Sequence, residues 1–188
     1  MSRMRYIGMV FLVLAGIAAS LAGIRIRAYA QTPERGAAPA AIAKPDATLL
    51  QLMRGMFYPA SNVVFAAQED LGRFTPPVDP SASPNPITSV YGGWQAVENA
   101  SLTIAEGSQL VLTPERACSN GKIAPVQRAD WKKFTEAMRQ AALKSYKAAQ
   151  TKSTDVMLDA ASDLSDSCLM CHQMFRPGAA GDKNRCLP

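Results

Sequence analysis

Four stretches of the chain place apolar residues at three- and four-residue steps, the spacing that gathers them on one face of an α-helix. We predict helices over residues 46–70, 90–112, 130–150 and 153–176. No stretch alternates apolar and polar residues strongly enough to predict a strand, and no internal repeat is evident. The expected fold class is therefore all-α.

The first helical stretch is expected to begin with Asp46 as its N-terminal cap. Pro59 lies inside it and should kink it, because proline lacks the backbone N–H and its ring clashes with the preceding turn. The prolines of residues 74–88 then argue against helix and strand alike, which predicts a long extended crossing. The apolar face of the first stretch consists of Leu49, Leu52, Met53, Met56, Ala60, Val63, Val64 and Ala67.

The other three stretches have comparable apolar faces. The second stretch is weakened near its end by Gly107. Its inward-facing residues are expected to be Trp94, Val97, Ala100, Ile104 and Leu110. A loop over residues 113–129 carries Cys118, and Asp130 caps the third stretch. The third stretch turns inward Trp131, Phe134, Met138, Ala141, Ala142 and Tyr146. The fourth turns inward Met157, Ala160, Leu164, Cys168, Cys171 and Phe175.

The beginning of the chain has the pattern of an export signal. Arg3 and Arg5 precede 19 uncharged residues, 6–24, and an Ala-Tyr-Ala cleavage site ends at residue 30. An uncleaved membrane anchor remains the alternative, because 19 residues can just span a bilayer. Residues 31–45 are rich in alanine and proline and predict a flexible leader, followed by one folded domain over residues 46–188. Either interpretation predicts an exported, periplasmic domain, in a compartment where disulfides form.

The positive charge of the chain is concentrated in this first segment. The 188 residues carry a formal net charge of +5, but residues 1–30 hold four arginines and no acid, so the remainder has 16 basic and 15 acidic residues. A net charge of +1 gives no support for nucleic-acid binding. A membrane is expected as a partner only if the N-terminal segment is retained.

The most informative motif is Cys168-Leu169-Met170-Cys171-His172. A Cys-x-x-Cys-His sequence is the attachment signature of c-type haem, in which each thiol adds across one haem vinyl group and the imidazole ligates the iron. A thioredoxin-like pair opens a helix after a strand, whereas this motif lies late in a helical pattern. A zinc site normally takes four Cys or His ligands, and His172 is the only histidine of the chain. The sequence therefore predicts one covalently attached haem c.

Four helical patterns with this motif late in the last one resemble the cytochrome c′ family, including its low-spin cytochrome c-556 type members. The resemblance covers residues 45–188 and is carried by residues 168–176 (CLMCHQMFR) and 52–59 (LMRGMFYP). It implies an antiparallel four-helix bundle with the haem near the end of the last helix. It further implies a haem pocket that includes Leu52, Met56, Phe175 and Arg176. Family members are often homodimers through their first two helices, so a homodimer stays open.

In such a bundle the start of the first helix lies beside the end of the fourth. A residue near the start of the first helix is therefore a candidate for the second axial ligand of the iron. At ~1.5 Å per residue, His172 lies roughly 6 Å from its helix end and Met53 roughly 10 Å from the start of its helix. Met53 is therefore the first candidate and Met56 the second, and an open iron is the third alternative. Histidine–methionine ligation suits electron transfer, whereas an open position suits a gaseous ligand.

The same topology brings the loop after the second helix and the tail after the fourth to one end of the bundle. In an oxidising compartment this predicts a disulfide between Cys118 and Cys186. The bond closes a loop of 69 residues, counted inclusively. In the chain-entropy model such a loop contributes on the order of 4 kcal/mol to stability.

These features predict a periplasmic mono-haem cytochrome that carries single electrons to and from redox partner proteins. We do not expect an enzyme, because no second histidine remains for acid–base chemistry. One alternative is a five-coordinate cytochrome that binds nitric oxide or carbon monoxide. Another is an electron-accepting subunit of a periplasmic dehydrogenase, docked through the basic face of the third helix (Lys132, Lys133, Arg139, Lys144 and Lys147).

Overall fold

The computed structural model describes residues 44–176 and 182–187. The predicted export signal, and the leader up to residue 43, lie outside the described residues. Within the described ranges the chain is helical and has no strand, only one isolated β-bridge between Ala117 and Ile123. The all-α prediction is confirmed for this part of the chain.

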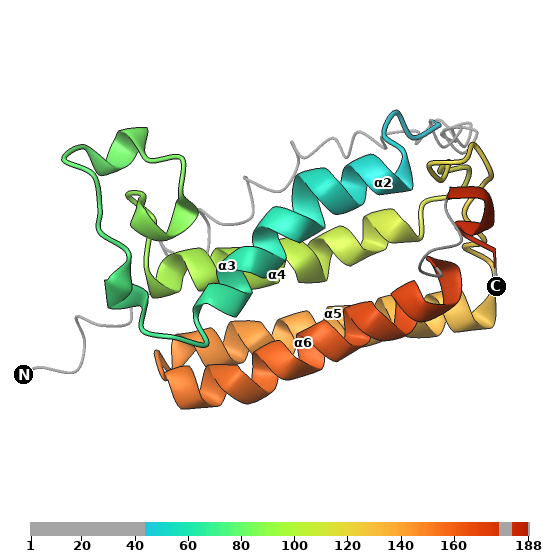
Figure 1. Ribbon diagram of the computed structural model, residues 1–188. Coiled ribbons are helices and arrows are strands. Elements are labelled where there is room, and N and C mark those ends of the chain that lie inside the picture. The colour runs from blue at the N-terminus through green and yellow to red at the C-terminus, as the bar shows by residue number, and fades with distance from the viewer. Residues whose placement is uncertain (1–43, 177–181, 188) are drawn as a thin grey trace, which may run out of the picture. The chain divides into compact units, whose positions relative to one another are not determined.

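Four helical segments make up most of the described chain (Figure 1). The first, residues 49–66, consists of α2 (Leu49–Leu52), a π-helical turn η1 (Met53–Phe57) and α3 (Tyr58–Ala66). The others are α4 (Trp94–Val111), α5 (Ala129–Gln150) and α6 (Thr154–Phe175). Helix α3 packs on α4, α4 on α5, and α5 on α6. Successive segments run in opposite directions in Figure 1, so the start of α2 and the end of α6 lie at the same end.

Thr48, and not Asp46, caps the first helical segment. The Thr48 hydroxyl accepts a hydrogen bond from the Gln51 N–H at 3.2 Å, and the Gln51 side-chain oxygen accepts one from the Thr48 N–H at 2.9 Å. This reciprocal capping box satisfies two backbone donors at once, which a single Asp46 carboxylate does not match. The predicted apolar face is buried or half-buried along its length, with Phe57 as a further buried member.

The proline-rich crossing is not simply extended. It contains three 3₁₀ turns, η2 (Leu71–Arg73), η3 (Pro80–Ala82) and η4 (Pro86–Thr88). The side chains of Asp79 and Asn85 accept hydrogen bonds from the N–H groups of Ser81 and Ile87 at 2.9 and 3.0 Å. Proline suits the first position of such turns because its N–H would have no partner there. The prediction missed them because it treated proline only as a helix breaker.

Helix α4 starts four residues later than predicted, after Gly93, whose φ of +57° is accessible at little cost only to glycine.

Gly107 is buried within α4 and does not end it. A Cβ at Gly107 would lie 2.6 Å from the Sδ of Met56, so the Met56 side chain packs where a larger residue would force it to move. The inward position assigned to Leu110 was wrong: its side chain is 39% exposed, and Val111 is buried instead.

Helix α5 begins at Ala129 with Arg128 as its N-cap, so the prediction of Asp130 as the cap was wrong by two residues. Asp130 instead lies in the first turn, where a carboxylate interacts favourably with the helix dipole. Helix α6 starts at Thr154, next to the predicted start at residue 153, and Ser153 is its N-cap. Its predicted apolar stripe is buried or half-buried throughout. None of the described helices is both long and apolar enough to span a bilayer.

Candidate functional site

A cavity of about 740 Å³ is lined by residues of the first helical segment, α4, α5, α6 and the C-terminal tail. Its volume falls within the ~300–1,000 Å³ typical of pockets for small molecules and cofactors. The cavity brings together most of the predicted site residues: Met53, Cys118, Cys168, Cys171, His172, Phe175, Arg176 and Cys186. It therefore unites the start of the first segment with the end of the last helix.

Cys168 and Cys171 are free, half-buried thiols on one face of α6. Burial raises the pKa of the Cys168 thiol. Burial, with smaller contributions from Cys168 and Asp130, raises the pKa of Cys171 to about 11. Both thiols are therefore protonated at neutral pH. This environment does not favour a thioredoxin-like pair, because disulfide oxidoreductases depend on a lowered thiol pKa.

His172 is half-buried beside these thiols and lines the same cavity. Burial, and then the positive charges of Arg176 and Arg185, lower the pKa of its imidazole. The neutral form is therefore favoured at neutral pH, and it is the neutral imidazole that ligates a metal.

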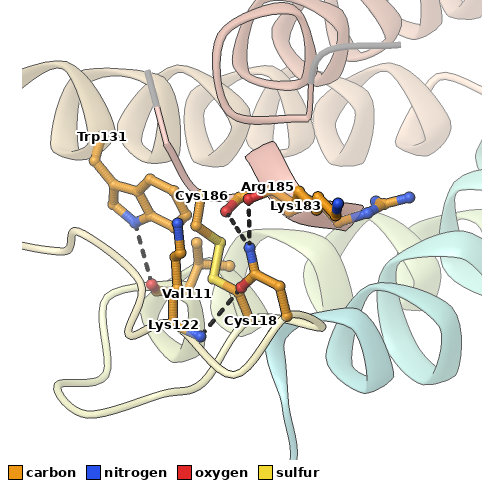
Figure 2. The surroundings of a disulfide bond; sticks show 8 residues. Val111, Cys118, Lys122, Trp131, Lys183, Arg185 and Cys186 are labelled. Atoms are coloured by element: carbon orange, nitrogen blue, oxygen red, sulfur yellow. Dashed lines mark hydrogen bonds between the residues drawn. A yellow bond between two sulfur atoms is a disulfide. The ribbon is translucent and has the colours of Figure 1, made fainter. Parts of the chain in front are cut away.

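Phe175, one turn after His172, holds the end of α6 in an aromatic cluster. Its ring meets those of Trp131 and Phe134 edge-on, with centroids 4.7 and 6.3 Å apart. The Trp131 indole N–H donates to the Val111 carbonyl at 3.3 Å, which ties the cluster to α4 (Figure 2). The cluster thus limits the movement of the helical turn that carries His172.

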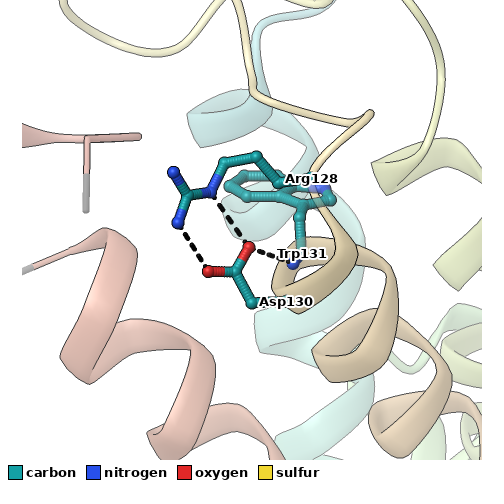
Figure 3. Close-up of polar contacts among 3 residues, drawn as sticks. All are labelled: Arg128, Asp130 and Trp131. Atoms are coloured by element: carbon teal, nitrogen blue, oxygen red, sulfur yellow. Dashed lines mark hydrogen bonds and ion pairs between the residues drawn. The ribbon is translucent and has the colours of Figure 1, made fainter.

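Arg128 covers the same cluster from the start of α5. Its guanidinium lies 5.8 Å from the centroid of the Phe175 ring. It also forms a two-pronged ion pair with Asp130, at 3.0 and 2.7 Å, while the Asp130 carboxylate accepts the Trp131 N–H at 2.8 Å (Figure 3). The sequence prediction missed Arg128, although an arginine two residues before an acid at a helix start was a visible signal.

The two candidate methionines occupy different environments. Met53 lines the cavity, whereas Met56 is not among its lining residues and instead places its thioether against Gly107 of α4. Leu52, also predicted for the pocket, is buried in the core and does not line the cavity either. The structure therefore places Met53, and not Met56, in the same cavity as His172.

The Cys118–Cys186 disulfide is present, as predicted, with the two Cα atoms 6.5 Å apart. Both cysteines line the cavity. The Cys186 N–H donates to the Phe175 carbonyl at 2.8 Å. The Asn120 side-chain amide donates to the carbonyls of Lys183 and Arg185 at 3.3 and 3.0 Å. The bond and these contacts hold the tail against the end of α6.

Three arginines line the cavity, namely Arg54, Arg176 and Arg185, and its described lining contains no carboxylate. Such a lining favours a ligand that carries negative charge. Arg176 was predicted at this site. Arg54 and Arg185 were missed, although Arg54 follows Met53 and Arg185 precedes Cys186 directly in the sequence.

Together these residues fit a haem c. The cavity offers two protonated thiols, a neutral imidazole, a thioether and three guanidinium groups that complement two propionates. Among the described residues, no three His, Cys, Asp or Glu side chains are grouped to hold a metal ion directly. A haem iron needs only an axial histidine of this kind from the protein.

Comparisons with protein-family models, with curated proteins and with solved structures find no match to this chain.

Proposed function

We propose that this chain is an exported mono-haem c-type cytochrome that carries single electrons. One observation carries the proposal: Cys168, Cys171, His172 and Met53 line a single cavity large enough for a cofactor. The first three belong to one motif, but Met53 lies in another helical segment far away in sequence. The sequence pattern alone did not require these residues to meet.

In this proposal each residue has a defined role. The Cys168 and Cys171 thiols would each hold the haem through one vinyl group, with one S–H bond and one vinyl π bond replaced by a C–S and a C–H bond, so that no oxidant is needed. The His172 imidazole and the Met53 thioether would ligate the iron. A haem held in this way would supply one-electron redox chemistry, which histidine–methionine ligation favours.

The surrounding residues protect and orient these groups. The aromatic side chains of Phe134 and Phe175 and the disulfide-held Cys186 line the cavity and would pack against the haem. Arg54, Arg176 and Arg185 supply positive charge for the two propionates. The proposal also includes the finer architecture, an antiparallel four-helix bundle with the haem near the end of the last helix, and a periplasmic location with redox proteins as partners.

The test is to produce the full chain in a periplasm that attaches haem c and to measure covalent haem per chain after denaturation. We expect one haem per chain, reduced at least tenfold in the Cys168→Ala/Cys171→Ala double variant. Met170→Leu is the matched control, because Met170 lies between the two cysteines but is 44% exposed and does not line the cavity. A wild-type chain that folds in that host without covalent haem refutes the proposal.

The absorption spectrum separates this function from the gas-binding alternative. Methionine ligation gives a weak far-red band in the ferric state and leaves the ferrous iron unreactive towards carbon monoxide. A high-spin spectrum that changes on addition of carbon monoxide would instead indicate a five-coordinate cytochrome. The haem would then be correctly placed, but the role given to Met53 would be wrong.

A further inference from the structure

The first helical segment changes its hydrogen-bonding pattern beside the cavity. In η1 the Tyr58 N–H donates to the Met53 carbonyl, five residues back instead of the usual four. Such a turn is equivalent to one extra residue inserted into an α-helix. Because one residue turns an α-helix by about 100°, the extra residue sets how Met53 is oriented relative to α3.

Pro59 explains why the regular pattern fails at this position. In an α-helix its nitrogen would have to donate to the Gly55 carbonyl, but proline has no N–H and its ring clashes with that carbonyl. The wider turn relieves the clash, and Pro59 falls in the first turn of α3, where its nitrogen needs no partner. Gly55 is exposed, and no atom lies within 4 Å of a Cβ built on it.

The wider turn separates the two methionines. Met53, at its start, lines the cavity that contains His172. Met56 packs on Gly107 of α4, and Phe57 beside it is buried. Met53, Arg54 and Phe57 of this turn thus line the cavity, whereas the Met56 side chain faces α4.

We propose that Pro59 and the π-helical turn η1 together set the helical register that presents Met53 to the cavity as the axial ligand. This inference rests on the proposed function, because it assumes that a haem iron occupies the cavity. Pro59 is then a positioning residue: it touches no reacting atom, but it fixes the rotation of the helical turn that carries the ligand. A regular α-helix through this region would turn Met53 away by about 100° relative to α3.

The test compares two variants with the wild-type chain. Pro59→Ala removes the clash, so the segment should close into a regular α-helix. The residue that the π-helical turn accommodated is still present, so Met53 should be rotated out of the cavity. Deletion of Gly55 in the Pro59→Ala background removes the extra residue, so a regular helix again presents Met53. Pro114→Ala is the matched control, because Pro114 is an exposed loop proline that does not line the cavity.

The readouts are covalent haem per chain, the ferric far-red band, carbon monoxide binding by the ferrous protein, and helix content by circular dichroism. We expect full covalent haem in every variant. The far-red band should fall below a tenth of its wild-type intensity in Pro59→Ala, with new carbon monoxide binding. It should return in the variant that also lacks Gly55 and stay unchanged in Pro114→Ala.

Four outcomes would overturn the proposal that Pro59 and η1 set the helical register of Met53. An unchanged band in Pro59→Ala would show that packing on α4 holds the turn without the proline. A band that does not return on deletion of Gly55, in a chain with native helix content and haem, would show that register is not the cause. A wild-type chain with covalent haem but no methionine band would reject Met53 as ligand and leave the cytochrome proposal standing, whereas absent haem rejects both. If Pro59→Ala alone does not fold, the variant that also lacks Gly55 still tests the proposal. Its far-red band must be present when its helix content and covalent haem are native.

Discussion

At the scale of single residues, the site depends on differences between similar side chains. Met53 and Met56 are both half-buried, both on the predicted apolar face, and one turn apart. Only the first lines the cavity, because the thioether of the second fills the space above Gly107. Sequence periodicity separated the two only by their height along the helix, because it had no information on the glycine of another helix.

Met53→Ala and Met56→Ala should therefore behave in opposite ways. We expect Met53→Ala to convert a low-spin spectrum into a high-spin one that responds to carbon monoxide, because the proposed sulfur ligand of the haem iron is removed. Met56→Ala should keep the wild-type spectrum and lower the free energy of unfolding, by at most about 2 kcal/mol given its partial burial. Absorption spectra and denaturant titrations measure both effects, and a spectral change in Met56→Ala alone would exchange the two assignments.

At the scale of the helices, local signals decided where each element begins. Thr48 caps the first segment in place of Asp46 because the Gln51 side chain accepts a hydrogen bond from the Thr48 N–H in return. Helix α6 starts where the sequence predicted, because the Ser153 side chain caps its first turn. We expect Thr48→Ala to lower the free energy of unfolding by about 1 kcal/mol, since the capping bond to the first turn is lost. Asp46→Ala should change it by less than about 0.5 kcal/mol. Denaturant titration gives both values, and equal losses would restore Asp46 as a cap.

The contact of Met56 with Gly107 should appear as an energetic coupling between two helical segments. Gly107→Ala gains up to about 1 kcal/mol of helix propensity, but its new methyl group collides with the Met56 thioether. In the Met56→Ala background the collision with that thioether is removed. The substitution should therefore be more favourable there than in the wild-type chain, by about 1 kcal/mol or more in a double-mutant cycle. Additive effects would mean that Met56 moves aside at no cost.

The limits of sequence prediction follow the same division between local and distant effects. Periodicity correctly located all four helical segments and the stripe that carries Cys168 and Cys171, because those patterns are local. It did not predict the π-helical turn, which depends on how a clash at Pro59 is relieved, nor the burial of Gly107, which depends on another segment. Arg54 and Arg185 were missed for the same reason, since only the folded chain shows that they share a cavity.

At the scale of the whole molecule, the Cys118–Cys186 disulfide joins the loop after α4 to the tail after α6 at the end that holds the cavity. It was predictable because chain topology alone brings these two connections to one end. The bond has two consequences. It restricts the unfolded chain, and it holds Arg185 at the cavity, where its positive charge adds to burial and Arg176 in lowering the pKa of His172. These two consequences can be separated experimentally.

We expect the Cys118→Ser/Cys186→Ser double variant to keep its covalent haem, because Cys168 and Cys171 are unchanged. Its free energy of unfolding should fall by up to about 4 kcal/mol, since the unfolded chain is no longer cross-linked. Mild reduction of the wild-type protein should produce the same loss, because a reductant opens the disulfide but leaves thioether bonds intact. Arg185→Gln is the matched control: it removes the charge at the cavity and keeps the bond, so it should change the spectrum or potential of the haem more than the stability. A double variant as stable as the wild type would show that the contacts of Asn120 and Phe175 hold the tail in place without the bond.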